Sequence, residues 1–164
     1  MARCFIIQPF DNDKFDARYR ETFKPAIEEA GFEPYRVDED VSVLIPINDI
    51  EQGIRSATVC FAEISKDNAN VWYELGYAVA CARPVVMVCE KNARLKLPFD
   101  IQHRSIIYYD PDTASGFEKV KTDITARLRG VTQDLTRKRE IAANLSPEHI
   151  NWIREQFLAA SPRQ

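Results

Sequence analysis

The acidic residue Glu74 stands in a position from which its carboxylate could do chemistry. It follows the polar segment 65–70 and lies about one turn into an amphipathic segment, in which the apolar residues Val71, Leu75 and Ala78 recur at helical spacing. Glu74 is one helical step from that stripe, so we expect its carboxylate to be partly buried at the rim of a crevice. A carboxylate there could hydrogen-bond ribose hydroxyls, or stabilise the sugar cation that forms when a base leaves. The alternative is a surface charge that the helix dipole alone favours.

Further residues on two loops, and at the start of the helix that follows the second loop, are expected to bind substrate. The rings of Phe10 and Trp72 could hold a base, and the polar loop could hold a phosphate, because free backbone N–H groups point out of a helix N-terminus. The full set is Gln8, Pro9, Phe10, Asp11, Ser65, Asp67, Asn68, Asn70 and Trp72. Helix packing is the alternative role for Trp72. Asn68 and Asn70 also suit turn and cap positions, with Asn70 as the candidate helix cap.

Short apolar runs alternate with amphipathic segments along the chain, a pattern typical of βαβ units on a parallel sheet. The expected strands are 4–8, 32–37, 58–62, 85–89 and 106–109, and the expected helices are 15–30, 47–56, 71–82 and 117–129. The run at 58–62 is apolar on both faces, which favours a central position. We predict an α/β fold, a flavodoxin-like three-layer sandwich around a five-stranded parallel sheet of order 2-1-3-4-5. Ligands bind such sheets beyond the carboxyl ends of the strands, here between the first and the third.

Residues 1–130 are expected to form this domain, and residues 131–164 a C-terminal helical extension. In the extension, Ser146 is a good helix cap and Pro147 a good first helical residue, so an extra C-terminal helix is predicted there. That helix could pack back on the domain or bind another chain.

Composition narrows the classes of function. The net charge of −3 over 164 residues gives no global positive field, so we expect no nucleic-acid partner. No apolar run approaches the roughly 18 residues of a membrane-spanning helix, and the first residues lead directly into a strand. We therefore expect a cytoplasmic protein without a membrane partner. The two histidines lie far apart and the cysteines form no C-x-x-C pair, so no metal is expected.

Segments 57–65 and 68–78 together resemble the nucleoside 2-deoxyribosyltransferase-like and TIR-like domains of bacteria. In those domains a strand that ends in an acid leads to a helix with the motif N-x-N-V-x-Y-E-L-G-x-A. Weaker matches are Gln8-Pro9-Phe10, Arg36-Val37-Asp38-Glu39, Asn48-Asp49-Ile50 and Leu97-Pro98-Phe99-Asp100. The resemblance covers about residues 3 to 110.

The resemblance implies a flavodoxin-like fold and cleavage of the N-glycosidic bond of a nucleoside, a nucleotide or NAD, which would be a substrate and not a cofactor. The family's glutamate maps onto Glu74, as the nucleophile or as the group that holds the ribose. Many such domains act in defence or signalling only when assembled, so a homo-oligomer is also implied. Two positions depart from the pattern. Glu63 stands where relatives carry Asp, and Asn68 stands where deoxyribosyltransferases carry a second acid.

We therefore predict a TIR-like hydrolase of NAD or a related nucleotide, a reading that Trp72 favours slightly. One alternative is a nucleoside 2-deoxyribosyltransferase or deoxynucleotide N-glycosidase. The other is a nucleotide-binding or self-association module without catalysis.

Overall fold

The chain divides into two compact units, Met1–Val131 and Thr132–Gln164. The computed structural model describes residues 2–11, 13–39, 46–94, 97, 101–145, 148–152 and 155. The second unit holds the end of helix α5 (Ala114–Ala143) and a helical stretch at 148–152. The helix start predicted at Ser146 and Pro147 lies outside the described residues, as do positions 98–100 of the Leu97-Pro98-Phe99-Asp100 match.

Five parallel strands form one sheet in the order β2-β1-β3-β4-β5, which confirms the predicted flavodoxin-like topology. The strands are β1 Ala2–Ile7, β2 Phe32–Tyr35, β3 Val59–Glu63, β4 Val85–Glu90 and β5 Ile106–Tyr109. Every residue of β3 is buried, as expected for a central strand of a parallel sheet covered on both faces. The chain order reverses between β1 and β3, which pair in parallel with Phe5 opposite Cys60.

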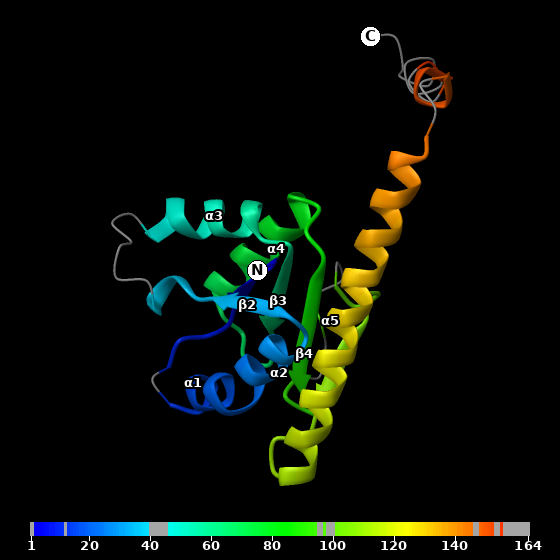
Figure 1. Cartoon of the computed structure of the whole chain (residues 1–164). Coiled ribbons are helices and arrows are strands. Elements are labelled where there is room, and N and C mark those ends of the chain that lie inside the picture. Colours follow the sequence, from blue (N-terminus) through cyan, green and yellow to red (C-terminus); the bar gives the residue numbers. More distant parts are fainter. Residues whose placement is uncertain are drawn as a thin grey trace. The chain divides into compact units, whose positions relative to one another are not determined.

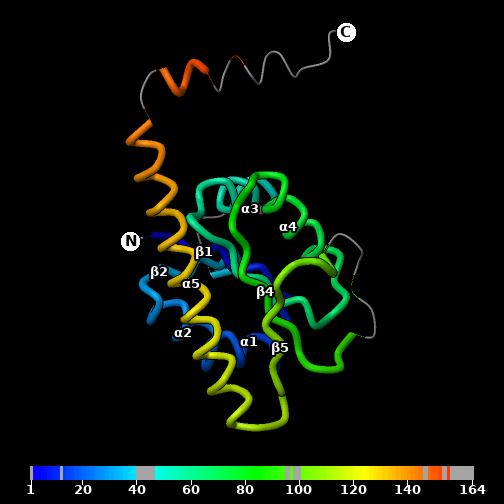
Figure 2. The backbone as a smooth tube through the Cα atoms, turned by 90° about the vertical axis from the view of Figure 1, so that its right-hand side faces the viewer, coloured from blue at the N-terminus to red at the C-terminus, as the bar shows by residue number. Residues whose placement is uncertain are grey.

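Helices cover both faces of the sheet, so the first unit is a three-layer sandwich (Figure 1, Figure 2). Helices α3 and α4 pack on one face, and α2, the π-helical turn η1 and the first part of α5 pack on the other. The remaining bounds are α1 Lys14–Arg18, η1 Tyr19–Phe23, α2 Lys24–Glu29, η2 Val37–Glu39, α3 Pro46–Ser56 and α4 Ala69–Ala80.

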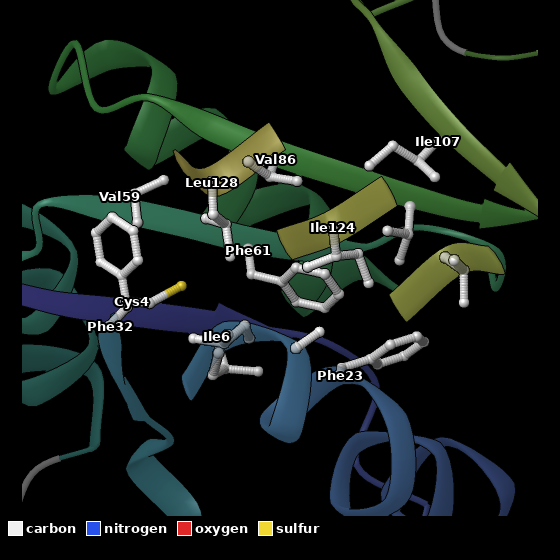
Figure 3. Packing of buried hydrophobic residues seen from close by; sticks show 14 of the residues in the cluster. Cys4, Ile6, Phe23, Phe32, Val59, Phe61, Val86, Ile107, Ile124 and Leu128 are labelled. Carbon is white, nitrogen blue, oxygen red and sulfur yellow. The ribbon is translucent and has the colours of Figure 1, made fainter. Parts of the chain in front are cut away.

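Alternate residues of each strand feed two separate hydrophobic clusters, one on each face of the sheet. Ile6 and Phe61 point to the α5 side, whereas Ile7 and Cys60 point to the α3 and α4 side. Figure 3 shows the first cluster, in which the rings of Phe23 and Phe61 lie with their centroids 5.1 Å apart. The two clusters hold the sheet between its helices. The loops that follow the strands lie at the carboxyl ends of the sheet.

Several elements differ in their bounds from the sequence-based expectation, most of all α5, which runs to Ala143 instead of ending near residue 129. The helix expected over 15–30 forms without a gap as α1, η1 and α2, but it widens to a π-helical turn in the middle, because Pro25 has no backbone N–H to donate to the carbonyl four residues earlier. The second strand ends at Tyr35 instead of Val37, because the chain turns into the 3-10 segment η2.

Candidate functional site

Glu74 lies on α4 beside the buried stripe and is itself buried, with only 6% of its surface exposed. Burial raises the pKa of its carboxyl to about 7. Burial also raises the pKa of the Cys60 thiol on β3 to about 12, and the nearby charge of Glu74 adds to that effect. Glu74 therefore lies on the buried side of α4, with Val71, Leu75 and Ala78. Among the residues that the structure describes, none donates a hydrogen bond to its carboxylate or forms an ion pair with it.

Helix α4 begins earlier than the sequence indicated. The side chain of Asn68 is the cap, and it accepts hydrogen bonds from the backbone N–H groups of Asn70 at 2.9 Å and Val71 at 3.2 Å. The expectation that Asn70 caps the helix is wrong, and Asn70 is an exposed residue of the first turn. With α4 starting at Ala69, Glu74 lies beyond the first turn, where no free N–H groups remain to favour an acid. The helix dipole therefore does not account for this glutamate.

The Trp72 side chain contacts both members of a neighbouring ion pair, Asp67 and Arg94. Its indole Nε1 donates to Asp67 at 2.6 Å, and Arg94 forms an ion pair with the same carboxylate at 2.8 Å. The Arg94 guanidinium also lies 4.7 Å from the centre of a Trp72 ring. The hydrogen bond from Trp72, followed by that from Arg94, lowers the pKa of Asp67. Trp72 and Asp67 thus hold each other, and one face of the indole is covered by the guanidinium.

In the loop after β1, Gln8 is buried and hydrogen-bonded, whereas the ring of Phe10 is exposed. Gln8 and Pro9 are buried, and the Gln8 amide donates to Asp16 at 3.4 Å. Phe10 is 48% exposed, and the Arg36 guanidinium lies 4.9 Å from the centre of its ring. Of the two aromatic rings expected to hold a base, Phe10 has the more exposed surface.

Arg36, which follows β2, contacts Phe10 in the loop after β1 and Asp38 in the segment after β2. It is buried and forms ion pairs with Asp16 at 2.8 Å and Asp38 at 2.5 Å. Burial alone would lower the pKa of Arg36, but hydrogen bonds and charge from the two carboxylates raise it above its usual value. The match at Arg36 therefore corresponds to a buried ion pair that positions Phe10.

A hollow of about 360 Å³ lies at the carboxyl ends of β1, β3 and β4. Its lining includes Asp11, Lys14 and Phe15 on one side and Ser65, Lys66 and Glu90 on the other. The predicted binding residues Asp11 and Ser65 meet there, as the sheet order requires. Glu74 and Trp72 are not part of this lining.

Asp11 also has a local structural role, because its carboxylate accepts hydrogen bonds from backbone N–H groups at the start of α1. These come from Asp13 at 3.1 Å and Phe15 at 3.2 Å. Asp11 thus shapes the wall of the hollow while its charge is engaged by the backbone.

A polar network lies behind the hollow, and it begins at Glu63, the last residue of β3. Glu63 is fully buried, and burial raises the pKa of its carboxyl to about 7. It accepts hydrogen bonds from the Ser65 backbone N–H at 3.3 Å, the Ser65 hydroxyl, and the Tyr109 hydroxyl at 3.4 Å. The Ser65 oxygen accepts in turn from the backbone N–H of Glu90 at 2.7 Å.

The network ends in a charge cluster that sequence reasoning missed. Glu90, the last residue of β4, pairs with Arg18 at 2.5 Å and with Lys14 at 3.3 Å. Arg18 also donates to the Tyr109 hydroxyl at 3.2 Å. An acid that closes an apolar run is a detectable signal for Glu90, since that end of a parallel strand faces the ligand side. Among the described residues, no group of three His, Cys, Asp or Glu side chains is arranged to hold a metal ion.

Comparison with known proteins supports the fold. The chain matches no protein-family model and no curated protein. It is similar to the crystal structure of the TIR domain of the Toll-related receptor TRR-2 from the lower metazoan Hydra magnipapillata. The TM-score is 0.55 at 15% sequence identity, over 76% of this chain and 98% of that domain. The first unit therefore has a TIR-like fold.

Other parts of the resemblance stay predictions, namely the bacterial origin, the likeness to deoxyribosyltransferases, the nucleotide partner and the homo-oligomer. Within the part of the chain that is described, no helix is long and apolar enough to span a membrane. The cytoplasmic location stays a prediction.

Proposed function

We propose that this TIR-like chain hydrolyses the N-glycosidic bond of NAD or a related nucleotide, with Glu74 as the essential carboxylate. One observation carries the proposal: Glu74 is 6% exposed, and no described residue pairs with its carboxylate. Other buried acids, such as Asp16 and Glu63, have partners within the fold. Burial that raises the pKa of an acid is common at functional sites, and a buried polar group that the fold leaves without a partner calls for an explanation.

The energetic cost of Glu74 supports this reading. Its pKa of about 7, against an ordinary value of 4.5, means that the fold disfavours its ionised form. At about 1.4 kcal/mol for each pKa unit, the penalty above pH 7 is on the order of 3 kcal/mol. A position that served stability alone would carry an apolar residue there, beside Val71 and Ala78.

The chemistry requires the ionised form of Glu74. When nicotinamide leaves with the bonding electron pair, positive charge develops at C1′ of the ribose, and a carboxylate in a dry environment stabilises that charge. Water then bonds to C1′ and releases a proton. The same carboxylate can accept hydrogen bonds from the ribose hydroxyls and so orient the sugar.

The experiment is to incubate the full chain with NAD and follow nicotinamide release, comparing the wild type with Glu74→Gln. Glu21→Gln is the control, because Glu21 is an exposed glutamate of the opposite helical layer. We expect release by the wild type and the control, and a loss of at least about 100-fold in kcat for Glu74→Gln. Equal release by Glu74→Gln would refute the proposal.

A binding module without catalysis is the second candidate, favoured by the absence of Glu74 from the lining of the hollow. It predicts that NAD raises the Tm of the wild type and of Glu74→Gln equally, and that neither protein releases nicotinamide at high concentration or under crowding.

A further inference from the structure

One wall of the hollow at the carboxyl ends of β1, β3 and β4 contains a hydroxyl that is bonded to a buried acid. Ser65 lines the hollow and is 6% exposed, whereas Glu63 has no exposed surface. The Glu63 carboxylate accepts hydrogen bonds from the Ser65 hydroxyl and, at 3.3 Å, from the Ser65 backbone N–H. A single side chain therefore connects the acid to the hollow.

The Ser65 hydroxyl has one hydrogen to donate and two lone pairs with which to accept. Its hydrogen goes to Glu63, and one lone pair accepts from the backbone N–H of Glu90 at 2.7 Å. No hydrogen bond of the described residues uses the second lone pair. Because Ser65 lines the hollow, it offers this acceptor to a ligand there as long as Glu63 is ionised.

Protonation of Glu63 gives the carboxyl a hydrogen that needs an acceptor. The Ser65 backbone N–H can only donate, and the Tyr109 oxygen, at 3.4 Å, already accepts from Arg18 at 3.2 Å. The Ser65 oxygen is closer to Glu63 than the Tyr109 oxygen is, so it is the acceptor that we expect. Both lone pairs of Ser65 are then in use, by Glu63 and by the Glu90 N–H, and its own hydrogen is left for an acceptor in the hollow.

Charged side chains from two neighbouring elements act on Glu63. The charge of Glu90, at the end of β4, raises the pKa of the Glu63 carboxyl, and that of Arg18 on α1 lowers it. Lys14 of the same helix reaches the network through Glu90, with which it pairs at 3.3 Å, and Arg18 pairs with Glu90 at 2.5 Å. Both cations of α1 thus pair with Glu90 and not with Glu63.

Two uncharged titratable groups also lie beside Glu63. Burial raises the pKa of the Tyr109 hydroxyl on β5 above its usual value, and it raises the pKa of the Cys89 thiol on β4 to about 11. Burial raises the pKa of Glu63 to about 7, although the hydrogen bonds from Ser65 lower it in part. Of Glu63, Cys89 and Tyr109, it is therefore Glu63 that changes its charge near neutral pH.

We propose that Glu63 and Ser65 form a proton switch in the wall of the hollow. When Glu63 takes up a proton, the hydrogen bond between the two side chains reverses, and Ser65 changes from an acceptor to a donor toward a ligand in the hollow. A ligand group that donates is then favoured at high pH, and a group that accepts is favoured at low pH. This inference does not depend on the proposed function, which assigns no step to Glu63 or Ser65.

The test follows the full chain by NMR from pH 5 to pH 9, in a Glu74→Gln background so that Glu74 does not titrate in the same range. The carboxyl carbon of Glu63 reports its proton, and the amide hydrogen of Glu90 reports the Ser65 oxygen that accepts from it. We expect both signals to change with one midpoint near 7. The amide hydrogen moves upfield as Glu63 is protonated, because the Ser65 oxygen then accepts from a second donor.

Two variants in the same background test the reversal. Glu63→Gln carries an amide that can donate to Ser65 as the protonated acid does, so we expect its Glu90 amide signal at pH 8 to match the signal of the background protein at pH 5. Ser65→Ala removes a hydrogen bond that favours the ionised acid, and we expect the midpoint of Glu63 to rise by about one pH unit. Ser115→Ala, at an exposed serine of α5, leaves the midpoint unchanged.

Each part of the proposal can fail. A Glu63 carboxyl that keeps one form from pH 5 to pH 9 overturns the switch. A Glu63 that titrates without any change at the Glu90 amide, or a Glu63→Gln variant whose amide signal stays at the high-pH position, overturns the reversal of the hydrogen bond. Equal midpoints in Ser65→Ala and Ser115→Ala overturn the role of Ser65. None of these results bears on nicotinamide release, which tests the proposed function separately.

Discussion

Two buried glutamates, Glu63 at the end of β3 and Glu74 within α4, differ in their partners, although burial raises the pKa of each to about 7. Their surroundings differ. Glu63 accepts hydrogen bonds from Ser65 and Tyr109, whereas no described residue donates to Glu74. A raised pKa by itself therefore does not mark an acid of this fold as functional. The difference lies in the hydrogen-bond partners: Glu63 has them within the fold, and we propose that Glu74 finds its partner in a ligand.

Both groups affect stability in the same direction as pH changes. Below about pH 4.5 each is protonated in the folded and the unfolded chain, so neither contributes to a pH dependence. Between 4.5 and about 7 the folded chain keeps the proton that the unfolded chain has lost, so stability falls as pH rises. Because pH affects both glutamates alike, the difference between Glu63 and Glu74 has to be tested by substitution.

The largest expected change in the free energy of unfolding comes from the polar network that contains Glu63. Arg18→Met leaves Glu90 close to Glu63 with only Lys14 as a partner, and we expect it to lower the free energy of unfolding by about 3 kcal/mol. Urea denaturation at pH 8 measures this. Arg20→Met, a change at an exposed arginine of η1, serves as the control and should stay within about 0.5 kcal/mol of the wild type. A small loss for Arg18→Met would mean that the network does not hold the strand ends together.

The next effect concerns the hydroxyl that links the two acids of the network. Ser65→Ala removes a donor to Glu63 and the acceptor for the Glu90 backbone N–H, both in buried surroundings. We expect a loss of about 2 kcal/mol, because the groups left without partners pay for their desolvation. Ser115→Ala, at an exposed serine of α5, is the control. If both variants unfold alike, Glu63 is not held by its partners and the contrast with Glu74 disappears.

The smallest expected effect is the pH profile of the reaction. Glu74 must be ionised to stabilise the sugar cation, and its pKa is about 7. We expect kcat for NAD to rise roughly tenfold from pH 6 to pH 8 and to level off above that. A profile that is flat over this range, or that falls with pH, would assign Glu74 another role.

The fold could be predicted from the sequence because apolar runs and amphipathic segments alternate without ambiguity. The run 58–62, apolar on both faces, became the fully buried strand β3, and the rule for right-handed crossovers then fixed the strand order. Element ends were less predictable. Asn68 and Asn70 are equally good caps in isolation, and the choice between them depends on the path of the loop.

The site could be predicted only in part. The burial of Glu74 followed from its place beside the helical stripe, and the meeting of Asp11 with Ser65 followed from the sheet order. The sequence does not indicate Lys14 and Arg18 as site residues, because charged residues four apart are common on surface helices. Their roles depend on Glu90, which is 72 residues away from Arg18 in the sequence and adjacent to it only in the folded chain.

The most direct test of the account is the free energy of unfolding of the wild type and of Glu74→Gln, measured by urea denaturation at pH 5 and at pH 8. Because glutamine has no charge to bury, we expect the variant to gain roughly 2 kcal/mol relative to the wild type between the two pH values. Parallel behaviour of the two proteins across this range would contradict the account, since Glu74 would then carry no unpaired buried charge.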